Sequence, residues 1–308
     1  MTERTKRALL NWEGCRFALA VFREDCLIKH RKYLHLRRWM YRRLRKMGQK
    51  VFHASSSSSS SSKIQALYEL CKQNFTPSGT PPPSPEVIQK LRSLMDTITP
   101  ADVGLTEDIR DDGHGSFGLN QFNRAGPWVK PITYLDIHEC DSFTMCVFCF
   151  PTSSVIPLHD HPGMTVLSKV LYGSLHVKAY DWVEPAQIQR STAPSNSPVR
   201  LAKLAADKVV TAPCETQVLY PKIGGNLHCF TAVAPCAVLD VLTPPYNNAA
   251  GRTCTYYHDY PYSGFSAVGN EDEPRDGNEE EYAWLAPLPG PKDFYTIPRK
   301  YRGPAIEV

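Results

Sequence analysis

The pattern that most constrains the fold is a run of short apolar segments between residues 132 and 242, separated by Gly, Pro or Asp. These segments are rich in Val, Leu and Phe, and their length and spacing are typical of strands in a β-sandwich or barrel. The 26 prolines also disfavour a mainly helical protein, because proline breaks helix interiors. We therefore predict an all-β domain. The predicted strands are Ile132–His138, Phe143–Phe150, Ser154–Leu158, Thr165–Leu171, Ser174–Trp182, Arg200–Ala206, Lys208–Ala212, Gln217–Tyr220, His228–Ala234 and Cys236–Leu242.

The first part of the chain has a different composition. Residues 1–50 hold 15 Lys+Arg and 4 Asp+Glu, a net charge of +11. Because the whole chain has 35 Lys+Arg and 31 Asp+Glu, the other residues hold 20 and 27, a net charge of −7. The basic segment is interpreted either as a solvated, partly helical tail or as a nuclear-import signal. The serine tract Ser55–Ser62 has no apolar side chain to bury, so we expect a flexible linker there.

A helical lead-in is expected over about residues 63–100. Ile64–Cys71 carries apolar residues at helical spacing, and Ser84 is placed as the N-cap of a second short helix. The sequence therefore predicts two regions. These are a basic, flexible extension over residues 1–62 and a folded domain over residues 63–308 that begins with short helices.

The cysteines indicate a reducing compartment. Most of the ten lie inside apolar runs such as Met145–Phe150, which is typical of reduced core residues. We expect no secretory signal peptide and no membrane span, because no apolar run approaches the roughly 20 residues that a bilayer requires.

Two histidines stand two residues apart in the segment Pro157–Met164. On a strand, His159 and His161 point to one face and Asp160 points to the other, so the two imidazoles can converge on one cation. A third histidine, His228, follows the turn Gly224-Gly225-Asn226 at the start of a later strand. An HxH motif, a hairpin, intervening strands and then Gly-x-x-His is the pattern of the cupin barrel, a double-stranded β-helix. We therefore predict an all-β cupin barrel with short N-terminal helices and a metal held by these three histidines.

The donor set bears on the choice of metal. Many cupins offer a carboxylate four or five residues after the HxH motif, but Thr165 and Val166 stand at those positions here. Three neutral imidazoles leave open positions on the metal for an anionic chelating substrate and for dioxygen. A thiolate with a neighbouring amine would be such a substrate. Zinc accepts three histidines, whereas oxygen chemistry requires a redox metal.

The chain resembles the plant cysteine oxidases, relatives of animal aminoethanethiol (cysteamine) dioxygenase, over about residues 63–308. Matching segments include Ile132–Leu135, Pro157–Pro162, Leu171–Trp182 and Asp240–Tyr246. The resemblance implies Fe(II) at the three histidines. It also implies oxidation of the N-terminal cysteine of target proteins to cysteine sulfinic acid with both atoms of O₂.

The same resemblance implies a biological role. The sulfinate would feed the arginine N-degron pathway, with group VII ethylene-response transcription factors among the substrates, so the enzyme resembles an oxygen sensor in hypoxia signalling. We therefore expect a monomer in the nucleus and cytoplasm. We expect no membrane partner and no direct contact with nucleic acid.

Four further residues take roles only through this resemblance. Asp240 would hold the substrate ammonium or accept its proton, with a structural acid as the alternative. Tyr246 would donate a hydrogen bond to reacting oxygen, with a simple turn residue as the alternative. Cys254 and Tyr256 could form the thioether crosslink of the animal relative, although we favour a plain pair of buried residues.

Three other functions remain open. One is a dioxygenase of small thiols, either free cysteine or cysteamine. A second is a zinc or manganese cupin isomerase, which metal analysis and oxygen uptake would distinguish. A third is a non-catalytic cupin that binds a ligand, or binds DNA through the basic segment.

Overall fold

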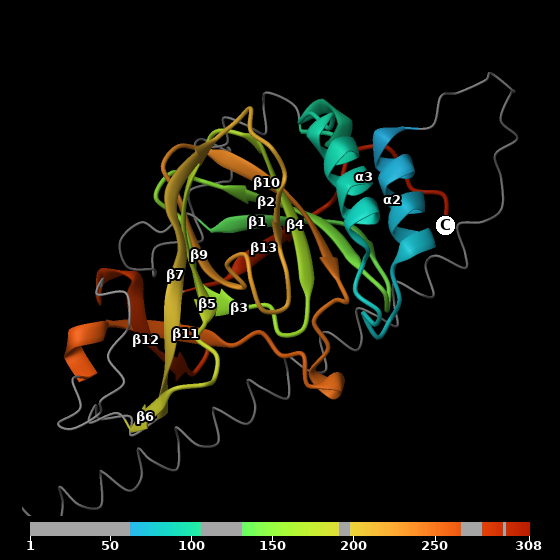
Figure 1. Cartoon of the computed structure of the whole chain (residues 1–308). Helices are drawn as coiled ribbons and strands as arrows, with labels where there is room; N and C mark the ends of the chain where they lie inside the picture. Colours follow the sequence, from blue (N-terminus) through green and yellow to red (C-terminus); the bar gives the residue numbers. More distant parts are fainter. Residues whose placement is uncertain (1–61, 106–130, 191–197, 266–278, 292–293) are drawn as a thin grey trace, which may run out of the picture. The chain divides into compact units, whose positions relative to one another are not determined.

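The computed structural model describes residues 62–105, 131–190, 198–265, 279–291 and 294–308 (Figure 1). The predicted extension over residues 1–62, apart from Ser62 itself, lies outside the described residues. In the described part, no helix is both long and apolar enough to cross a membrane.

In the described part of the chain, two helices precede the strands, as predicted. α2 spans Lys63–Asn74 and α3 spans Pro85–Asp96. Ser62 caps α2 by accepting a hydrogen bond from the Gln65 amide, and Ser84 caps α3 by accepting one from Val87. A short 3₁₀ turn, η1, follows at Ala101–Val103.

Thirteen strands and three further 3₁₀ turns follow within the described residues. Their bounds are β1 Ile132–Glu139, β2 Thr144–Phe150, β3 Val155–Asp160, β4 Thr165–Tyr172, β5 Ser174–Trp182, β6 Ile188–Arg190, β7 Pro198–Thr211, β8 Gln217–Leu219, β9 Leu227–Ala232, β10 Cys236–Thr243, η3 Asn248–Ala250, β11 Tyr256–Pro261, η4 Tyr262–Phe265, η5 Glu279–Glu281, β12 Tyr282–Leu288 and β13 Thr296–Arg299.

The strands form two sheets. One has the order β13-β1-β2-β10-β4-β8, and the other has the order β12-β11-β3-β9-β5-β7-β6. An additional pairing of β12 with β7 closes a ring of six strands in the second sheet. From β2 to β5, and again from β8 to β10, the chain alternates between the sheets strand by strand. This alternation is the double-stranded β-helix, so the predicted cupin barrel with helices before it is confirmed.

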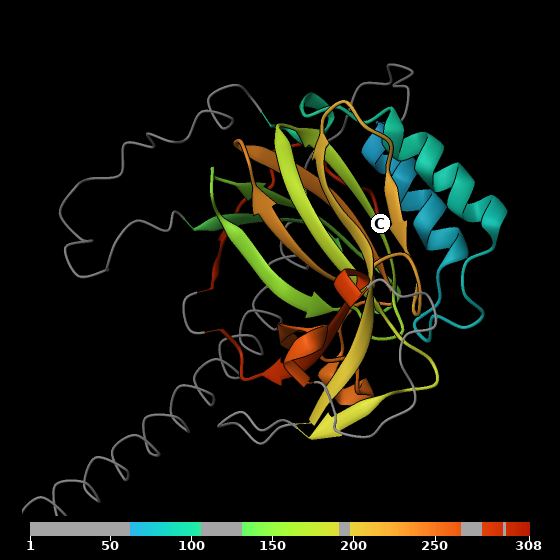
Figure 2. The same ribbon diagram turned by 60° about the vertical axis from the view of Figure 1, so that its left-hand side comes forward.

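The helices cover the outer face of the six-stranded sheet, where both views show them side by side (Figures 1 and 2). Apolar residues of α2 and α3 such as Leu67 and Leu91 share one buried cluster with Val147, Leu167 and Leu239 of the sheet. The inner face of that sheet looks into the barrel, towards β3, β5, β7 and β9.

The strand predictions need four corrections. Arg200–Ala206 and Lys208–Ala212 belong to one strand, β7, because Asp207 continues the pairing with β5. The short strand β6, which pairs with β7, was not predicted. β11 and β12 were not predicted. β13, which pairs in parallel with β1, was not predicted either.

The eight cysteines in the described residues are free thiols. Cys71, Cys146 and Cys236 are fully or almost fully buried. Burial raises the pKa of these thiols, as expected of inert core residues.

Candidate metal centre

The structure brings the three predicted histidines together. His159 on β3 and His228 on β9 are directly opposite each other in the antiparallel pair, and His161 follows the last residue of β3. One ring nitrogen from each of the three lies within 4.8 Å of the others. All three residues are buried. This group can therefore hold a metal ion, as the HxH and Gly-x-x-His motifs indicated.

The spacing of the rings fits one metal ion. The ring centroids are 4.9 Å apart for His159 and His161, 4.8 Å for His159 and His228, and 4.9 Å for His161 and His228. An imidazole whose nitrogen lies about 2.1 Å from a metal has its centroid about 3.2 Å away, so two rings about 100° apart at the metal would have centroids about 4.9 Å apart. The three rings thus occupy one face of a coordination sphere.

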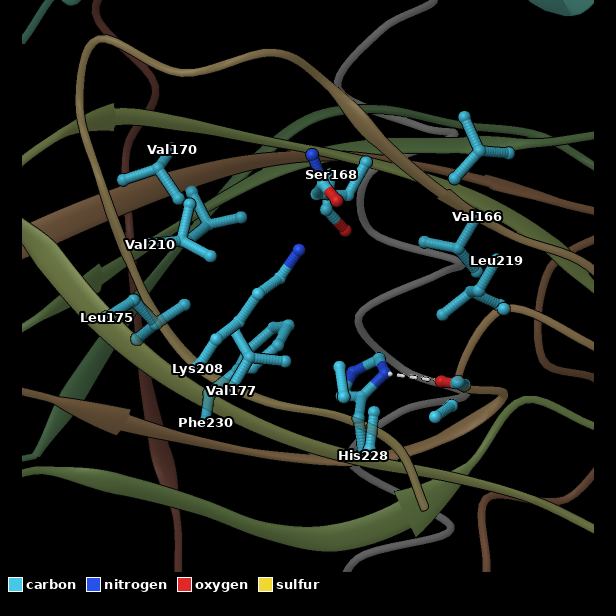
Figure 3. Close-up of a pocket in the computed structure, with 18 residues that line it drawn as sticks. Val166, Ser168, Val170, Leu175, Val177, Lys208, Val210, Leu219, His228 and Phe230 are labelled. Carbon is cyan, nitrogen blue, oxygen red and sulfur yellow. Dashed lines mark hydrogen bonds between the residues drawn. The ribbon is translucent and has the colours of Figure 1, made fainter. Parts of the chain in front are cut away.

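Backbone carbonyls orient two of the rings. His159 Nδ1 lies 2.8 Å from the Pro157 carbonyl oxygen, and His228 Nδ1 lies 3.3 Å from that of Gly225 (dashed line in Figure 3). A carbonyl oxygen only accepts, so the proton of each neutral ring is on Nδ1. The lone pair is then on Nε2 and available to a metal.

Tyr246 orients the third ring. Its hydroxyl donates to the Asp160 carbonyl oxygen at 2.7 Å and lies 2.8 Å from His161 Nδ1. Because the hydroxyl proton is used by the carbonyl, Nδ1 of His161 donates to the tyrosine oxygen. His161 Nε2 is buried without a hydrogen-bond partner, as expected of a nitrogen reserved for a metal. The tyrosine thus lies on the Nδ1 side of the ring, and its role as a donor to reacting oxygen stays a prediction.

The rings are neutral at physiological pH. Burial lowers the pKa of His159 to about 4, and burial together with the nearby His159 lowers that of His228 to about 3. Burial and the two neighbouring rings hold the pKa of His161 well below its usual value. Neutral imidazoles suit divalent iron as well as zinc, copper and nickel, so the donors fit Fe(II) without excluding those ions.

A cavity of about 280 Å³ lies beside His228, between the two sheets (Figure 3). Its wall is largely apolar and includes Val166, Val177 and Phe230, which stacks on the His228 ring at 4.3 Å. Among the described residues that line it, only Lys208 has a fixed charge, and its amine points across the cavity towards Ser168 (Figure 3).

Asp240 faces this interior from the other sheet. Its strand, β10, pairs with β2 and β4. Asp240 lies opposite Ser168, which lines the cavity and hydrogen-bonds to the carboxyl. One carboxyl oxygen is buried without a partner, and burial raises the pKa of Asp240 to about 7. A carboxyl with such a pKa can exchange a proton near neutral pH.

Cys254 and Tyr256 lie next to the centre. The Cys254 thiol is in hydrogen-bond contact with the hydroxyls of Tyr246 and Tyr256, and the Tyr256 ring packs 6.1 Å from that of His159. The crosslink between Cys254 and Tyr256 stays a prediction. Asp160 faces away from the histidines, as expected, and accepts hydrogen bonds from the Thr255 amide at 2.8 Å and the Tyr257 hydroxyl at 2.9 Å.

Sequence reasoning missed three polar residues around the centre. Asp181 and Asn226 hold the turn before His228, and Lys208 reaches into the cavity. The available signal was strand alternation. Asp181 continues the series of inward-facing residues of β5 after Val177 and Ala179. Lys208 likewise belongs to an inward-facing series on β7, since the residues two positions before and two after it also line the cavity. A charged side chain in an inward series indicates a special role.

Comparisons with known proteins agree with this geometry. The PCO_ADO family model matches residues 94–306. Plant cysteine oxidases 2 and 1 of Arabidopsis thaliana are 46% and 43% identical to this chain over 250 and 247 residues, each 79% of this chain and 83% and 80% of the relatives. Human 2-aminoethanethiol dioxygenase is 31% identical over 241 residues, 73% of this chain and 83% of the relative.

These relatives bear out the resemblance seen in the sequence. They are oxidases and dioxygenases by name, so the prediction of a dioxygenase-type oxidoreductase is confirmed. The chain therefore belongs to the PCO_ADO family.

Proposed function

We propose that this enzyme oxidises the N-terminal cysteine of target proteins to cysteine sulfinic acid. The S–H bond of the substrate and the O–O bond of dioxygen break, two S–O bonds form, and the released proton ends on the sulfinic acid group or in solvent. Sulfur loses four electrons and dioxygen gains four, so the reaction needs no further reductant.

The observation that carries the proposal is the convergence of three neutral histidines beside an open cavity. When bound by His159, His161 and His228, Fe(II) supplies the redox chemistry that joins dioxygen to a thiolate. The cavity wall is largely apolar, and the cavity is partly open to solvent, which leaves room for the rest of a peptide whose first residue lies at the centre.

Asp240 is the residue that we propose to handle the substrate proton. Its side chain enters the barrel interior beside Ser168, and its pKa of about 7 lets it accept a proton from a thiol or hold an ammonium group. Tyr246 acts through His161, whose ring it keeps in the Nδ1–H form. In this arrangement Asp240 is the catalytic acid or base, and Tyr246 is a positioning residue.

The cellular role follows from the proposed product. Proteins with an N-terminal cysteine sulfinate would enter the arginine N-degron pathway, so an enzyme that consumes O₂ to make them would sense oxygen in hypoxia. We propose group VII ethylene-response transcription factors as substrates and the nucleus and cytoplasm as the location. The similarity to plant cysteine oxidases 1 and 2 supports this role.

The direct test uses the full chain loaded with Fe(II) and a peptide that begins with Cys. We expect the peptide to gain two oxygen atoms by mass in air and none without oxygen. His161→Ala and His228→Ala should abolish the gain. His176→Ala is the matched control, because His176 lies outside the centre and pairs with Asp207 at 2.7 Å.

A small-thiol dioxygenase is the second candidate, because human 2-aminoethanethiol dioxygenase is similar to this chain. Free cysteine and 2-aminoethanethiol are therefore offered in parallel with the peptide. Consumption of either small thiol with an unmodified peptide would overturn the proposed substrate. Iron-independent turnover, or a catalyst active with zinc alone, would overturn the proposed chemistry.

A further inference from the structure

The turn Gly224–Asn226, which leads into His228, is held by one carboxylate from another strand. Asp181, near the end of β5, accepts hydrogen bonds from three successive backbone amides. The distances are 2.9 Å from Gly224 to Oδ2, 2.9 Å from Gly225 to Oδ1 and 3.0 Å from Asn226 to Oδ1. Successive amides that point at one anion form a concave binding arrangement, and hydrogen bonds to a charged group are stronger than neutral ones.

The held turn sets the orientation of His228. The amide of Gly225 donates to Asp181, and the carbonyl of the same residue accepts from His228 Nδ1 at 3.3 Å. Gly225 has φ +85°, and a Cβ there would lie 2.7 Å from the Cβ of Ala179. Asp181 and Ala179 are two residues apart on β5 and therefore lie on the same face of the strand. This face fixes the turn through the charge of Asp181 and the close packing of Ala179.

Asn226 extends the connection to His161. Its side-chain amide donates to the His161 carbonyl oxygen at 2.9 Å, and its side-chain oxygen accepts from the His161 amide at 3.2 Å. A third hydrogen bond runs to the Tyr220 carbonyl oxygen at 2.9 Å. Because β3 ends at Asp160, His161 lies beyond the strand ladder. The buried Asn226 side chain pairs with both backbone groups of this ligand, whose carbonyl oxygen also accepts from the Met164 amide at 3.1 Å.

Asp181 is therefore linked to His228 through Gly225, and Asn226 binds the backbone of His161 directly, without using a ring Nε2. We propose that they are positioning residues of the metal centre: Asp181 fixes the turn that orients His228, and Asn226 ties that turn to the backbone of His161. This inference rests on the proposed three-histidine centre. It adds two residues that determine metal affinity through the backbone.

Binding of Co(II) alone to the full chain tests the inference without relying on turnover. Affinity is measured by chelator competition, and the visible absorption of the bound ion reports its ligand geometry. We expect Asp181→Asn and Asn226→Ala each to weaken Co(II) binding about 10- to 100-fold, the range for changes in residues that support metal ligands. The absorption spectrum should also change, which a general loss of stability would not cause.

Asp96→Asn is the matched control. Asp96, at the end of α3, likewise holds a turn by accepting from a backbone amide, that of Thr216 at 2.7 Å, and from its hydroxyl at 2.6 Å. It contacts none of the three histidines in the described structure. We expect this variant to lose stability while keeping wild-type Co(II) affinity and spectrum.

The outcomes separate the inference from the function on which it rests. Wild-type Co(II) affinity and spectrum in a folded Asp181→Asn or Asn226→Ala protein would overturn the role of that residue. An equal loss of affinity in Asp96→Asn would overturn the inference, because the effect would then be general. A wild-type chain that bound no Co(II) would overturn the metal centre itself. If Asp181→Asn does not fold, Asp181→Glu keeps the charge with a longer arm, and it should show the same spectral change.

Discussion

Asp240→Asn should change how the stability of the metal-free protein depends on pH. The Asp240 side chain lies inside the barrel with one carboxyl oxygen unpartnered, and burial raises its pKa from 3.8 to about 7 against the hydrogen bond from Ser168. Ionisation of this group is therefore unfavourable in the folded state. Asparagine keeps the shape but cannot ionise.

The sign and size follow from proton linkage. Between pH 3.8 and about pH 7 the folded state holds a proton on Asp240 that the unfolded state has released, so the free energy of unfolding falls as the pH rises. At 1.36 kcal/mol for each pH unit, the free energy of unfolding of the wild-type protein decreases by about 4 kcal/mol in total. About 3 kcal/mol of this decrease occurs above pH 5. An unsatisfied asparagine amide would cost about 1–3 kcal/mol at every pH. Relative to wild type, the variant should therefore gain about 3 kcal/mol of stability between pH 5 and pH 8, from near equality at pH 5 to about 1–3 kcal/mol more stable at pH 8.

Urea unfolding of both chelator-treated proteins at several values between pH 5 and pH 8 measures this difference. Titration of the histidines affects both proteins alike and cancels. Asp102→Asn is the control: partial burial is outweighed by hydrogen bonds from Thr99 and by Lys63, so the pKa of Asp102 is lowered and its variant should show a constant difference over this range. A constant difference for Asp240→Asn as well would refute the reasoning. Activity on a Cys-initiated peptide should nevertheless fall at least about 10-fold, because a general acid or base is lost.

Other changes test the surroundings of the centre. Tyr246→Phe should weaken Co(II) binding about 10- to 100-fold in chelator competition, because the hydroxyl that supports a ligand ring is lost. Lys208→Glu should lower kcat/KM for Cys-initiated peptides with an acidic second residue and raise it for those with a basic one, each by up to about 5-fold, the value of an exposed charge pair. Lys90→Glu on α3 should leave this preference unchanged. Peptide mapping should recover Cys254 and Tyr256 unlinked; a species lighter by two hydrogen atoms would show the crosslink instead.

Local signals in the sequence predicted much of this fold. Ser84 caps α3 as expected, because capping depends only on residues within one turn of the helix. The strand Ser174–Trp182 was predicted with its observed bounds, since apolar and polar residues alternate along it and Gly173 precedes it. His159 and His228 were predicted as metal ligands from local signals too, because each motif places its histidine relative to a nearby turn or strand.

Strands that depend on distant partners were harder to predict. β11, Tyr256–Pro261, has no fully buried residue, and its place is set by pairing with β12 and with His159. β13 has four residues and exists through parallel pairing with β1, the first strand in the described part of the chain. In β7, Asp207 suggested a break, but it faces outward and pairs with His176, so the strand continues.

The hydrogen bonds around the ligands were the least predictable part of the site. A Gly224-Gly225 pair gives a turn with positive φ and exposes amides that need acceptors when they are packed against a sheet. The sequence could thus have indicated that some acceptor would cover this turn, but not which one. Asp181 is 43 residues away from Gly224. It can accept hydrogen bonds from the turn only because the β5–β9 register places Tyr180 beside Leu227. A shift of one residue would turn Asp181 to the outer face and leave the turn uncovered. The geometry of the metal centre therefore depends on strand register as much as on the identity of its ligands.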